Sequence, residues 1–158
     1  IEFPGVLYRG GAEQKIRQYL VNNNYVDTVI QLPQNLFFGT GIATCIIVLK
    51  KNKSDNRVCF IDASNEFVHE GNKNKLSDDN IKKIFDTHCN KEEIQYFSKV
   101  VTIPEIENKK FNLSVSTYVE KEDTTVELSI EEITDIIKVA VEKQNTLRTE
   151  FENIINSL

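Results

Sequence analysis

Residues 25–49, YVDTVIQLPQNLFFGTGIATCIIVL, carry the clearest indication of fold in this 158-residue sequence. The first eight residues, Tyr25–Leu32, are rich in β-branched side chains and predict a β-strand. The last eight, Ile42–Leu49, contain no charge, which is typical of a strand buried on both faces in the middle of an α/β sheet. Because only residues 33–41 join the two runs, we expect an antiparallel pair, since a parallel crossover needs about a dozen residues or more.

Shorter signals on either side of this pair predict the remaining elements of an α/β domain. Upstream, Ala12–Asn22 repeats apolar residues at helical spacing. Downstream, Ser77 is a good N-cap for a helix that carries two acids in its first turn. The expected elements after residue 49 are a strand at Arg57–Ile61, an irregular loop at Asp62–Leu76, a helix at Asp78–Thr87, a short helix from Asn90 to Phe97, a strand at Lys99–Ile103 ended by Pro104, and an extended segment at Phe111–Val119 laid across the body.

The end of the chain predicts a separate helical tail. We divide the sequence into a body at residues 1–119, an acidic linker at 120–128 and the tail at 129–158, where Ser129 and Glu132 form a capping box. Apolar residues then recur at the 4-3 spacing of a helix that packs against another helix. This assembly seam comprises Ile133, Ile137, Ala140, Gln144, Leu147, Phe151, Ile154 and Leu158. Either the body or a partner helix covers it, and we favour a partner because the linker separates the tail from the body.

Composition excludes several classes of protein. A chain with 40% hydrophobic residues and only 6 Gly and 3 Pro can bury a core and is not a low-complexity sequence. We find no apolar run long enough to span a membrane and no signal peptide, and Cys45, Cys59 and Cys89 fit reduced thiols in a cytoplasmic protein without a zinc site. Residues 119–158 hold 10 of the 24 acids, so the body is close to neutral, and its charge neither supports nor opposes nucleic-acid binding.

The start of the chain points to a longer parent. The sequence contains no methionine and opens at Ile1 with residues typical of the tail of a strand. We therefore expect a piece of a larger protein, with a tag-cleaved or processed start as the alternative.

Few residues indicate catalysis. The paired acids lie in the expected first turns of helices, where the helix dipole explains them, and His88 and Cys89 are neighbours that seldom face each other on a helix. Loop 33–41 is different because it places Asn35, Phe37 and Phe38 between two strands. Adjacent phenylalanines point in different directions, so one ring can join the core while the other lines a cleft. A base stacked on such a ring would gain roughly 1–3 kcal/mol.

Several stretches, taken together and in order, resemble the last third of the catalytic domain in methylation subunits of type I restriction–modification systems. The most specific block is LPQNLFFGTGIATCIIVL at residues 32–49. The other similar stretches are GVLYRGGAEQKIRQYL, VCFIDASNEF, LSDDNIKKIFDTHCNKEE and FNLSVSTYV. The resemblance covers about residues 4–119, whereas the C-terminal helix fits by position and character alone.

This resemblance implies the rear part of a Rossmann-like sheet in an adenine-specific DNA methyltransferase, which transfers a methyl group from S-adenosylmethionine to adenine N6. Such enzymes need a glycine-rich cofactor loop and an Asn-Pro-Pro-aromatic motif, and this sequence contains neither. We therefore expect the piece alone to bind no cofactor, to hold no catalytic residue or metal, and to be inactive. The alternative is a non-catalytic α/β interaction module that presents a bundle-forming helix.

The resemblance also implies roles for individual residues. Phe37 or Phe38 would form an aromatic wall for the target base, with Asn35 supporting the loop. The seam from Ile133 to Leu158 would join a specificity subunit and a second methylation subunit, and a restriction subunit is a further candidate partner. The lysines that would contact DNA phosphate, if they are not merely solvated turn residues, are Lys50, Lys51, Lys53, Lys73 and Lys75.

Overall fold

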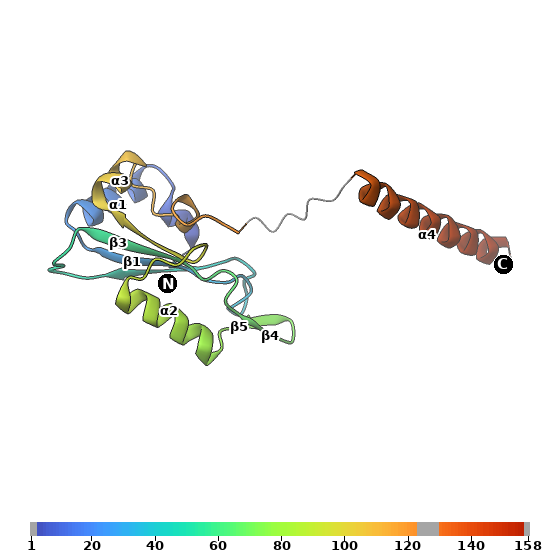
Figure 1. Ribbon diagram of the computed structural model, residues 1–158, viewed down its shortest axis with the longest axis horizontal. Coiled ribbons are helices and arrows are strands. Elements are labelled where there is room, and N and C mark those ends of the chain that lie inside the picture. The colour runs from blue at the N-terminus through green and yellow to red at the C-terminus, as the bar shows by residue number, and fades with distance from the viewer. Residues whose placement is uncertain (1–2, 123–129, 157–158) are drawn as a thin grey trace. The chain divides into compact units, whose positions relative to one another are not determined.

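A four-stranded sheet organises residues 3–122 in the computed structural model, which describes residues 3–122 and 130–156 (Figure 1). Its order is β2-β1-β3-β6, formed by β2 (Cys45–Leu49), β1 (Val26–Gln31), β3 (Arg57–Asp62) and β6 (Ser98–Thr102). The central strands β1 and β3 are parallel, and each has an antiparallel neighbour on its outer side. The antiparallel pairing predicted for the first two strands is therefore confirmed.

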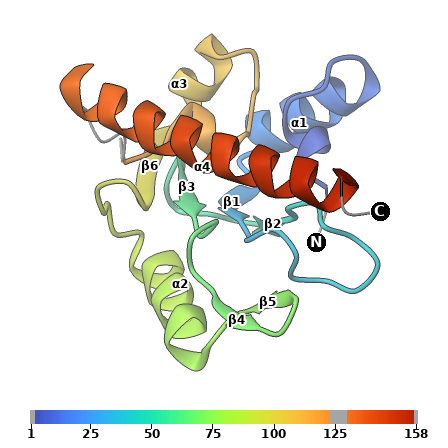
Figure 2. The same cartoon turned by 90° about the vertical axis from the view of Figure 1, so that its right-hand side faces the viewer.

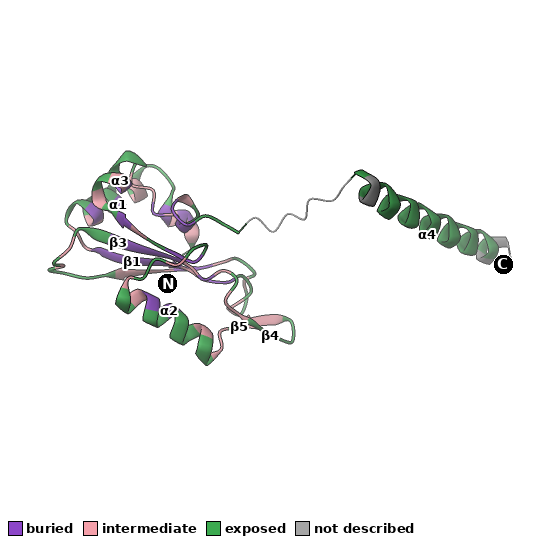
Figure 3. Cartoon of the chain, viewed as in Figure 1, coloured by how far each residue is buried: buried purple, intermediate pink, exposed green. Residues whose placement is uncertain are grey.

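Helices cover both faces of this sheet. On one side lie α1 (Ala12–Asn22), α3 (Ile103–Asn108) and the 3-10 turns η1 (Pro4–Leu7) and η2 (Val115–Thr117), and on the other lies α2 (Asp78–Asn90) (Figures 1 and 2). Alternation along β3 builds both cores, because Val58 and Phe60 join one cluster while Cys59 and Ile61 join the other. Figure 3 accordingly shows β1 and β3 as the most continuously buried elements.

The block at Ile42–Leu49 is not in the middle of the sheet, so that expectation is wrong. Its strand, β2, begins only at Cys45, and among the described residues it pairs with β1 alone, which places it at the edge of this sheet. Its apolar run is not matched by burial, because Ile42 remains 62% exposed and Leu49 54%. A charge-free run predicts that apolar surface will be covered, but it does not identify the element that covers it.

The connection from β3 to β6 differs from expectation at three places. Residues 62–76, predicted as an irregular loop, contain a hairpin of β4 (Val68–Glu70) and β5 (Lys73–Lys75). The short helix predicted from Asn90 is absent from these described residues. Asn90 is instead the last residue of α2, and its C-cap, Lys91, adopts the left-handed conformation. Glu93, within the stretch predicted as that helix, accepts a hydrogen bond from the amide of Val100 at 3.1 Å.

Other local signals are confirmed. Ser77 caps α2, since its Oγ accepts from the amide of Asn80 at 3.2 Å and Asn80 Oδ1 accepts from the amide of Ser77 at 3.0 Å. Pro104 does end the strand, but α3 begins immediately at Ile103, where proline is tolerated in the first turn. The segment 111–119 crosses the sheet and buries Leu113 and Tyr118 in the core.

A buried arginine ties three segments together on the α1 side. Arg17 is 5% exposed, and its guanidinium donates to the carbonyls of Val6, Arg9 and Phe111 at 2.7, 2.7 and 2.9 Å. Burial lowers the pKa of Arg17 from its ordinary value, although the Coulombic attraction of Glu13 opposes that shift. The N-terminal turn is thereby fixed to the segment that follows α3.

The second unit comprises residues 123–158 and is described by its helix, α4 (Ile130–Asn156). Of the predicted seam, Ile133, Ile137, Leu147 and Phe151 are between 43% and 63% exposed. The linker from residue 123, the cap at Ser129, the Ile154 side chain and Leu158 lie outside the described residues, so the predicted boundaries stay a prediction. Within residues 3–122 and 130–156, no helix has the length and apolar character that crossing a membrane requires.

Candidate functional site

The two phenylalanines of loop 33–41 have different environments. Phe37 is half-buried and packs against the core cluster that contains Ile30 and Leu32. Phe38 is 96% exposed, the highest value among the large hydrophobic residues described as exposed. The pair therefore consists of one anchoring ring and one ring presented to solvent, a distinction that the sequence left open.

Special backbone conformations give this loop its sharp path. Asn35 has φ +55° and Gly39 φ +80°, both in the left-handed region that Asn and Gly tolerate best. The amide of Asn35 donates to the carbonyl of Gly41 at 3.4 Å and closes the base of the loop. A Cβ at Gly41 would lie 3.0 Å from Asn35 Oδ1, so a larger residue there would crowd this closure.

The hairpin β4–β5 holds the loop from outside. Asn74 donates its main-chain amide to the Asn35 carbonyl at 3.1 Å and its Nδ2 to the Gln34 carbonyl at 2.8 Å. The Lys73 ammonium donates to the Phe37 carbonyl at 3.2 Å. These three hydrogen bonds, here called the hairpin clamp, join segments more than thirty residues apart in the chain. The hairpin was not predicted from the sequence, so its hydrogen bonds to the loop could not be predicted either.

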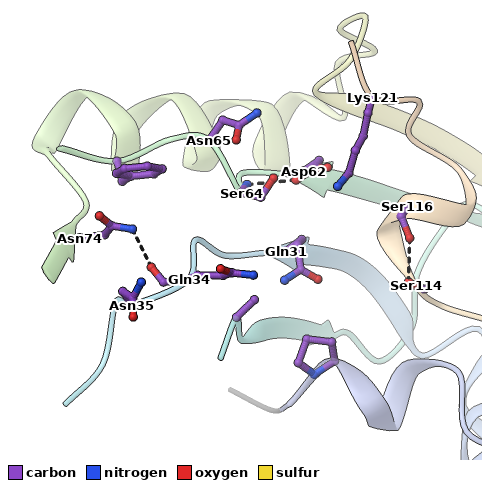
Figure 4. Close-up of a pocket in the computed structure, with 13 residues that line it drawn as sticks. Gln31, Gln34, Asn35, Asp62, Ser64, Asn65, Asn74, Ser114, Ser116 and Lys121 are labelled. Carbon is purple, nitrogen blue, oxygen red and sulfur yellow. Dashed lines mark hydrogen bonds between the residues drawn. The ribbon is translucent and has the colours of Figure 1, made fainter. Parts of the chain in front are cut away.

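A cavity of about 550 Å³ opens at the carboxyl ends of β1 and β3, the edge where ligands of parallel sheets usually bind (Figure 4). Amides and hydroxyls dominate the lining of this carboxyl-end cavity. The polar groups come from four separate segments and comprise Gln31, Gln34, Asn35, Asp62, Ser64, Asn65, Asn74, Ser114, Ser116 and Lys121. Sequence reasoning found only Asn35, because no short motif links residues spread over 90 positions.

A second, more apolar cavity of about 520 Å³ adjoins the hairpin clamp, since Lys73 and Asn74 both line it. Leu36, Phe37, Phe38 and Ile46 contribute to its lining, so we call it the loop cavity. Asn74 lines both cavities. Clamp residues thus line both a polar cavity and a more apolar one that includes the exposed Phe38 ring.

Charged groups gather instead at the amino ends of β1 and β3. Asp27, only 4% exposed, lies 3.0 Å from the Lys91 ammonium, which also lies 3.3 Å from Asp55. Burial alone would raise the pKa of Asp55, but the hydrogen bond and charge of Lys91 hold that pKa below its ordinary value. His88 Nδ1 lies 2.8 Å from Thr28 Oγ1 and 3.9 Å from the Asp27 carboxylate. We call Asp27, Asp55, His88 and Lys91 the ionic cluster. Its charged groups are at least partly buried and lie close to groups of opposite charge.

The structure separates the five predicted phosphate-binding lysines. The Lys53 side chain is 2% exposed and donates to the carbonyls of Val26 and Arg57 at 2.7 and 2.6 Å, and burial lowers its pKa. Its ammonium is therefore engaged by the backbone, which argues against a phosphate contact. Lys73 belongs to the clamp and Lys75 pairs with Glu70 at 3.1 Å, whereas Lys50 and Lys51 are exposed.

The three cysteines differ in exposure. Cys45 and Cys59 are buried and Cys89 is exposed, and burial raises the pKa of Cys59 to about 11. Among the described residues, no three His, Cys, Asp or Glu side chains come together as possible ligands of a metal ion.

Comparison with known sequences decides the family. A sequence model of the N-6 DNA methylase family matches residues 1–127, which include the sheet, the clamped loop and both cavities. The chain belongs to the N-6 DNA methylase family. It is 48% identical over 157 residues to the type I restriction enzyme MpnII methylase subunit of Mycoplasma pneumoniae, and 39% identical over 144 residues to the MjaVII methylase subunit of Methanocaldococcus jannaschii.

These family members are much longer than the present chain. The matches cover 99% and 85% of this chain but only 29% and 25% of the two relatives. A crystal structure of the type I restriction–modification methyltransferase subunit from Streptococcus thermophilus superposes with a TM-score of 0.73 at 42% identity, over 75% of this chain and 25% of that one. The EcoKI M protein has the same fold, with a TM-score of 0.61 at 14% identity over 94% of this chain and 39% of that one. The Rossmann-like α/β class is thereby confirmed.

Proposed function

We propose that this chain is part of the methylation subunit of a type I restriction–modification system, and that the whole protein methylates adenine N6 in DNA with S-adenosylmethionine. The observation that carries the proposal is Phe38, a ring 96% exposed at the tip of a loop that the hairpin clamp fixes in place. In a chain of the N-6 DNA methylase family, a fixed and exposed ring is suited to receive a planar base.

Each loop residue then has a distinct role. An enzyme that modifies a base inside a duplex must extrude it, and the unstacked base needs a new surface to lie against. Phe38 would supply one wall for the adenine, gaining roughly 1–3 kcal/mol of stacking. Phe37 would anchor the loop in the core, and Asn35 would support its reversal through the left-handed backbone.

The residues of this chain do not fit S-adenosylmethionine. Within the described part of the chain, the parallel strands β1 and β3 are followed by Leu32 and Ala63, and neither strand leads directly into a glycine-rich turn. We propose that the donor binds to a part of the longer protein outside this sequence. The isolated chain would then neither bind the donor nor methylate DNA.

Two surfaces are proposed for DNA and for partner subunits. Lys50 and Lys51 follow β2 and would contact phosphate, because both are exposed and neither ammonium pairs with another described residue. The heptad seam of α4, from Ile133 to Phe151, would pack with helices of a specificity subunit and a second methylation subunit. A restriction subunit would join the same assembly, whose location would be cytoplasmic.

The test is methylation by the full-length subunit assembled with its specificity subunit. We expect Phe38→Ala to change the free energy of unfolding by less than about 0.5 kcal/mol and to lower methylation about 10- to 100-fold. Phe38→Tyr should restore most of the activity. Phe37→Ala should instead destabilise the protein by about 3 kcal/mol, because it removes a ring packed on the core.

A matched control is Phe85→Ala, which removes another exposed phenylalanine from α2. It should affect neither stability nor methylation. If both loop substitutions only destabilise the protein, the aromatic wall is wrong. If the assembled wild-type protein methylates no DNA, the enzyme proposal fails and the interaction module takes its place.

A further inference from the structure

The carboxyl-end cavity contains polar groups that the fold does not use. The side chains of Gln34, Asn65 and Lys121 line it and form no hydrogen bond or ion pair with another described residue. Gln31 uses its Nε2 to donate to the carbonyls of Leu32 and Thr44, which leaves its Oε1 as an acceptor. Figure 4 shows the side chains of Gln31 and Lys121 directed toward the same space.

The chemistry of this lining matches a nucleotide. An amide presents a donor and an acceptor side by side, which is the pattern needed to pair with the edge of a base. Asp62 adds a carboxylate, one oxygen of which accepts from the amide of Ser64 at 3.0 Å, and an exocyclic amino group would suit its other oxygen. Lys121 is the one cation in the described lining and would favour a phosphate. Phe67 adds an aromatic surface.

The location relates this cavity to the target base. Asn35 and Asn74, which line it, belong to the hairpin clamp that also fixes the segment bearing Phe38. Phe38 lines the loop cavity, and Asn74 lines both this cavity and the carboxyl-end cavity, so a base stacked on Phe38 and a group bound in the carboxyl-end cavity would be neighbours. A DNA strand places successive nucleotides next to one another and could therefore occupy both cavities. A single small ligand would need only one of them.

We propose that the carboxyl-end cavity binds a nucleotide of the DNA next to the extruded adenine. Its base lies toward the amides of Gln31 and Gln34 and the carboxylate of Asp62, and its phosphate lies toward Lys121. This inference rests on the proposed function, since it assumes that Phe38 receives the adenine. The cavity volume of about 550 Å³ falls within the usual range of ligand sites.

The experiment uses the full-length subunit with its specificity subunit and a duplex that contains the recognition site. Gln34→Ala should raise the KM for DNA about 10-fold and leave kcat within about twofold, because it removes contacts made equally before and during the reaction. Lys121→Gln should lower the slope of log affinity against log salt by about 1, as expected for one lost phosphate contact. The controls Gln18→Ala and Lys82→Gln, on exposed faces of α1 and α2, should change neither value.

Position is tested by photocrosslinking. A series of duplexes carries 5-iodouracil at successive positions around the target adenine, and a nucleotide in the cavity should crosslink to the peptide that contains Phe67 from one or two adjoining positions only. Crosslinks confined to other peptides, in an assembly that methylates DNA and depends on Phe38, would overturn this inference and leave the proposed function intact. Loss of the specificity subunit from the Gln34→Ala or Lys121→Gln assemblies, seen by light scattering, would also overturn it, because the occupant would then be a protein.

Discussion

The two ends of the parallel strands β1 and β3 are built from different chemistry. At their amino ends, Asp27, Lys91 and Asp55 form contacts of 3.0 and 3.3 Å, and the Lys53 ammonium is enclosed by carbonyls. At their carboxyl ends, amides and hydroxyls, together with Asp62 and Lys121, line a cavity of about 550 Å³. The polar groups at the amino ends are used in contacts that stabilise the fold. Several polar groups at the carboxyl ends have no described partner and can bind a ligand.

This difference shows why charge alone is a poor guide to function in this chain. An ammonium in a low-dielectric environment must be paired or hydrogen-bonded, so the amino-end charges are explained by stability. An amide at a cavity edge can remain hydrated until a ligand replaces the water. We therefore expect substitutions at the amino end to affect stability strongly, and substitutions at the carboxyl end to affect binding.

The largest effect on stability is expected from Lys91→Met. It leaves the buried Asp27 carboxylate without its closest cation and should lower the free energy of unfolding by about 3 kcal/mol. Lys82→Met, on an exposed part of α2, is the control and should change it by less than about 0.5 kcal/mol. Urea denaturation of the chain measures both. If both variants lowered the free energy of unfolding equally, the ion pair of Lys91 with Asp27 would not stabilise the fold more than an exposed lysine does.

The pH dependence of stability is a second test of the ionic cluster, and we expect the free energy of unfolding to change by about 2–3 kcal/mol because of one buried thiol. Burial raises the pKa of Cys59, whose charge interactions include Lys91 and Asp27, from 9.0 to about 11. Between these values the unfolded chain has lost the thiol proton while the folded chain retains it, so the free energy of unfolding falls as the pH rises from 9 to 11. Cys59→Ala should flatten this decline, whereas Cys89→Ala, at an exposed position, should leave it unchanged.

Asn74→Ala should produce a smaller loss of stability, about 1 kcal/mol, because it removes the Nδ2 hydrogen bond to Gln34 and spares the main-chain bond to Asn35. The loosened loop should be cut faster by chymotrypsin after Phe38. Asn72→Ala, in the exposed turn of the hairpin, is the matched control. An unchanged rate of cleavage would mean that the clamp does not set the order of the loop.

The smallest change in stability is expected for Gln34→Ala. Its side chain is exposed and contacts no described partner, so the free energy of unfolding should stay within about 0.5 kcal/mol of the wild-type value. Denaturant midpoints of the variant and of Gln18→Ala should agree. A loss above 1 kcal/mol would make the amide structural, and the two ends of the sheet would no longer differ in kind.

Some local features of this fold were predictable from the sequence, although the β4–β5 hairpin and the end of α2 were not, whereas contacts between distant segments gave no sequence signal. The N-cap at Ser77 and the antiparallel β1–β2 pair depend on neighbouring residues, and both are confirmed. The position of β2 at the edge of the sheet depends on long-range pairing, because β3 pairs in parallel with β1 on the side away from β2. The apolar character of a run is a local property of the sequence, but its burial and its neighbours in the sheet are not.

The candidate site follows the same division. Loop 33–41 was predicted from its aromatics, but only the packing of Phe37 on the core distinguishes it from Phe38. Lys53 was grouped with the surface lysines because it lies in a polar turn, and only the fold brings its ammonium under the carbonyls of Val26 and Arg57. The carboxyl-end cavity has no sequence signal, since its walls meet only after the chain has folded.

The hairpin clamp also determines how freely the two segments can diverge in evolution. Its bonds reach the carbonyls of Gln34, Asn35 and Phe37, which every amino acid possesses. The donors include the side chains of Lys73 and Asn74, which few other residues can replace. Substitutions that keep the loop conformation could therefore alter its side chains without losing these anchors, while the hairpin must conserve its own. A loop grafted from a relative should therefore be held by the hairpin of this chain, provided that the grafted backbone adopts the same conformation.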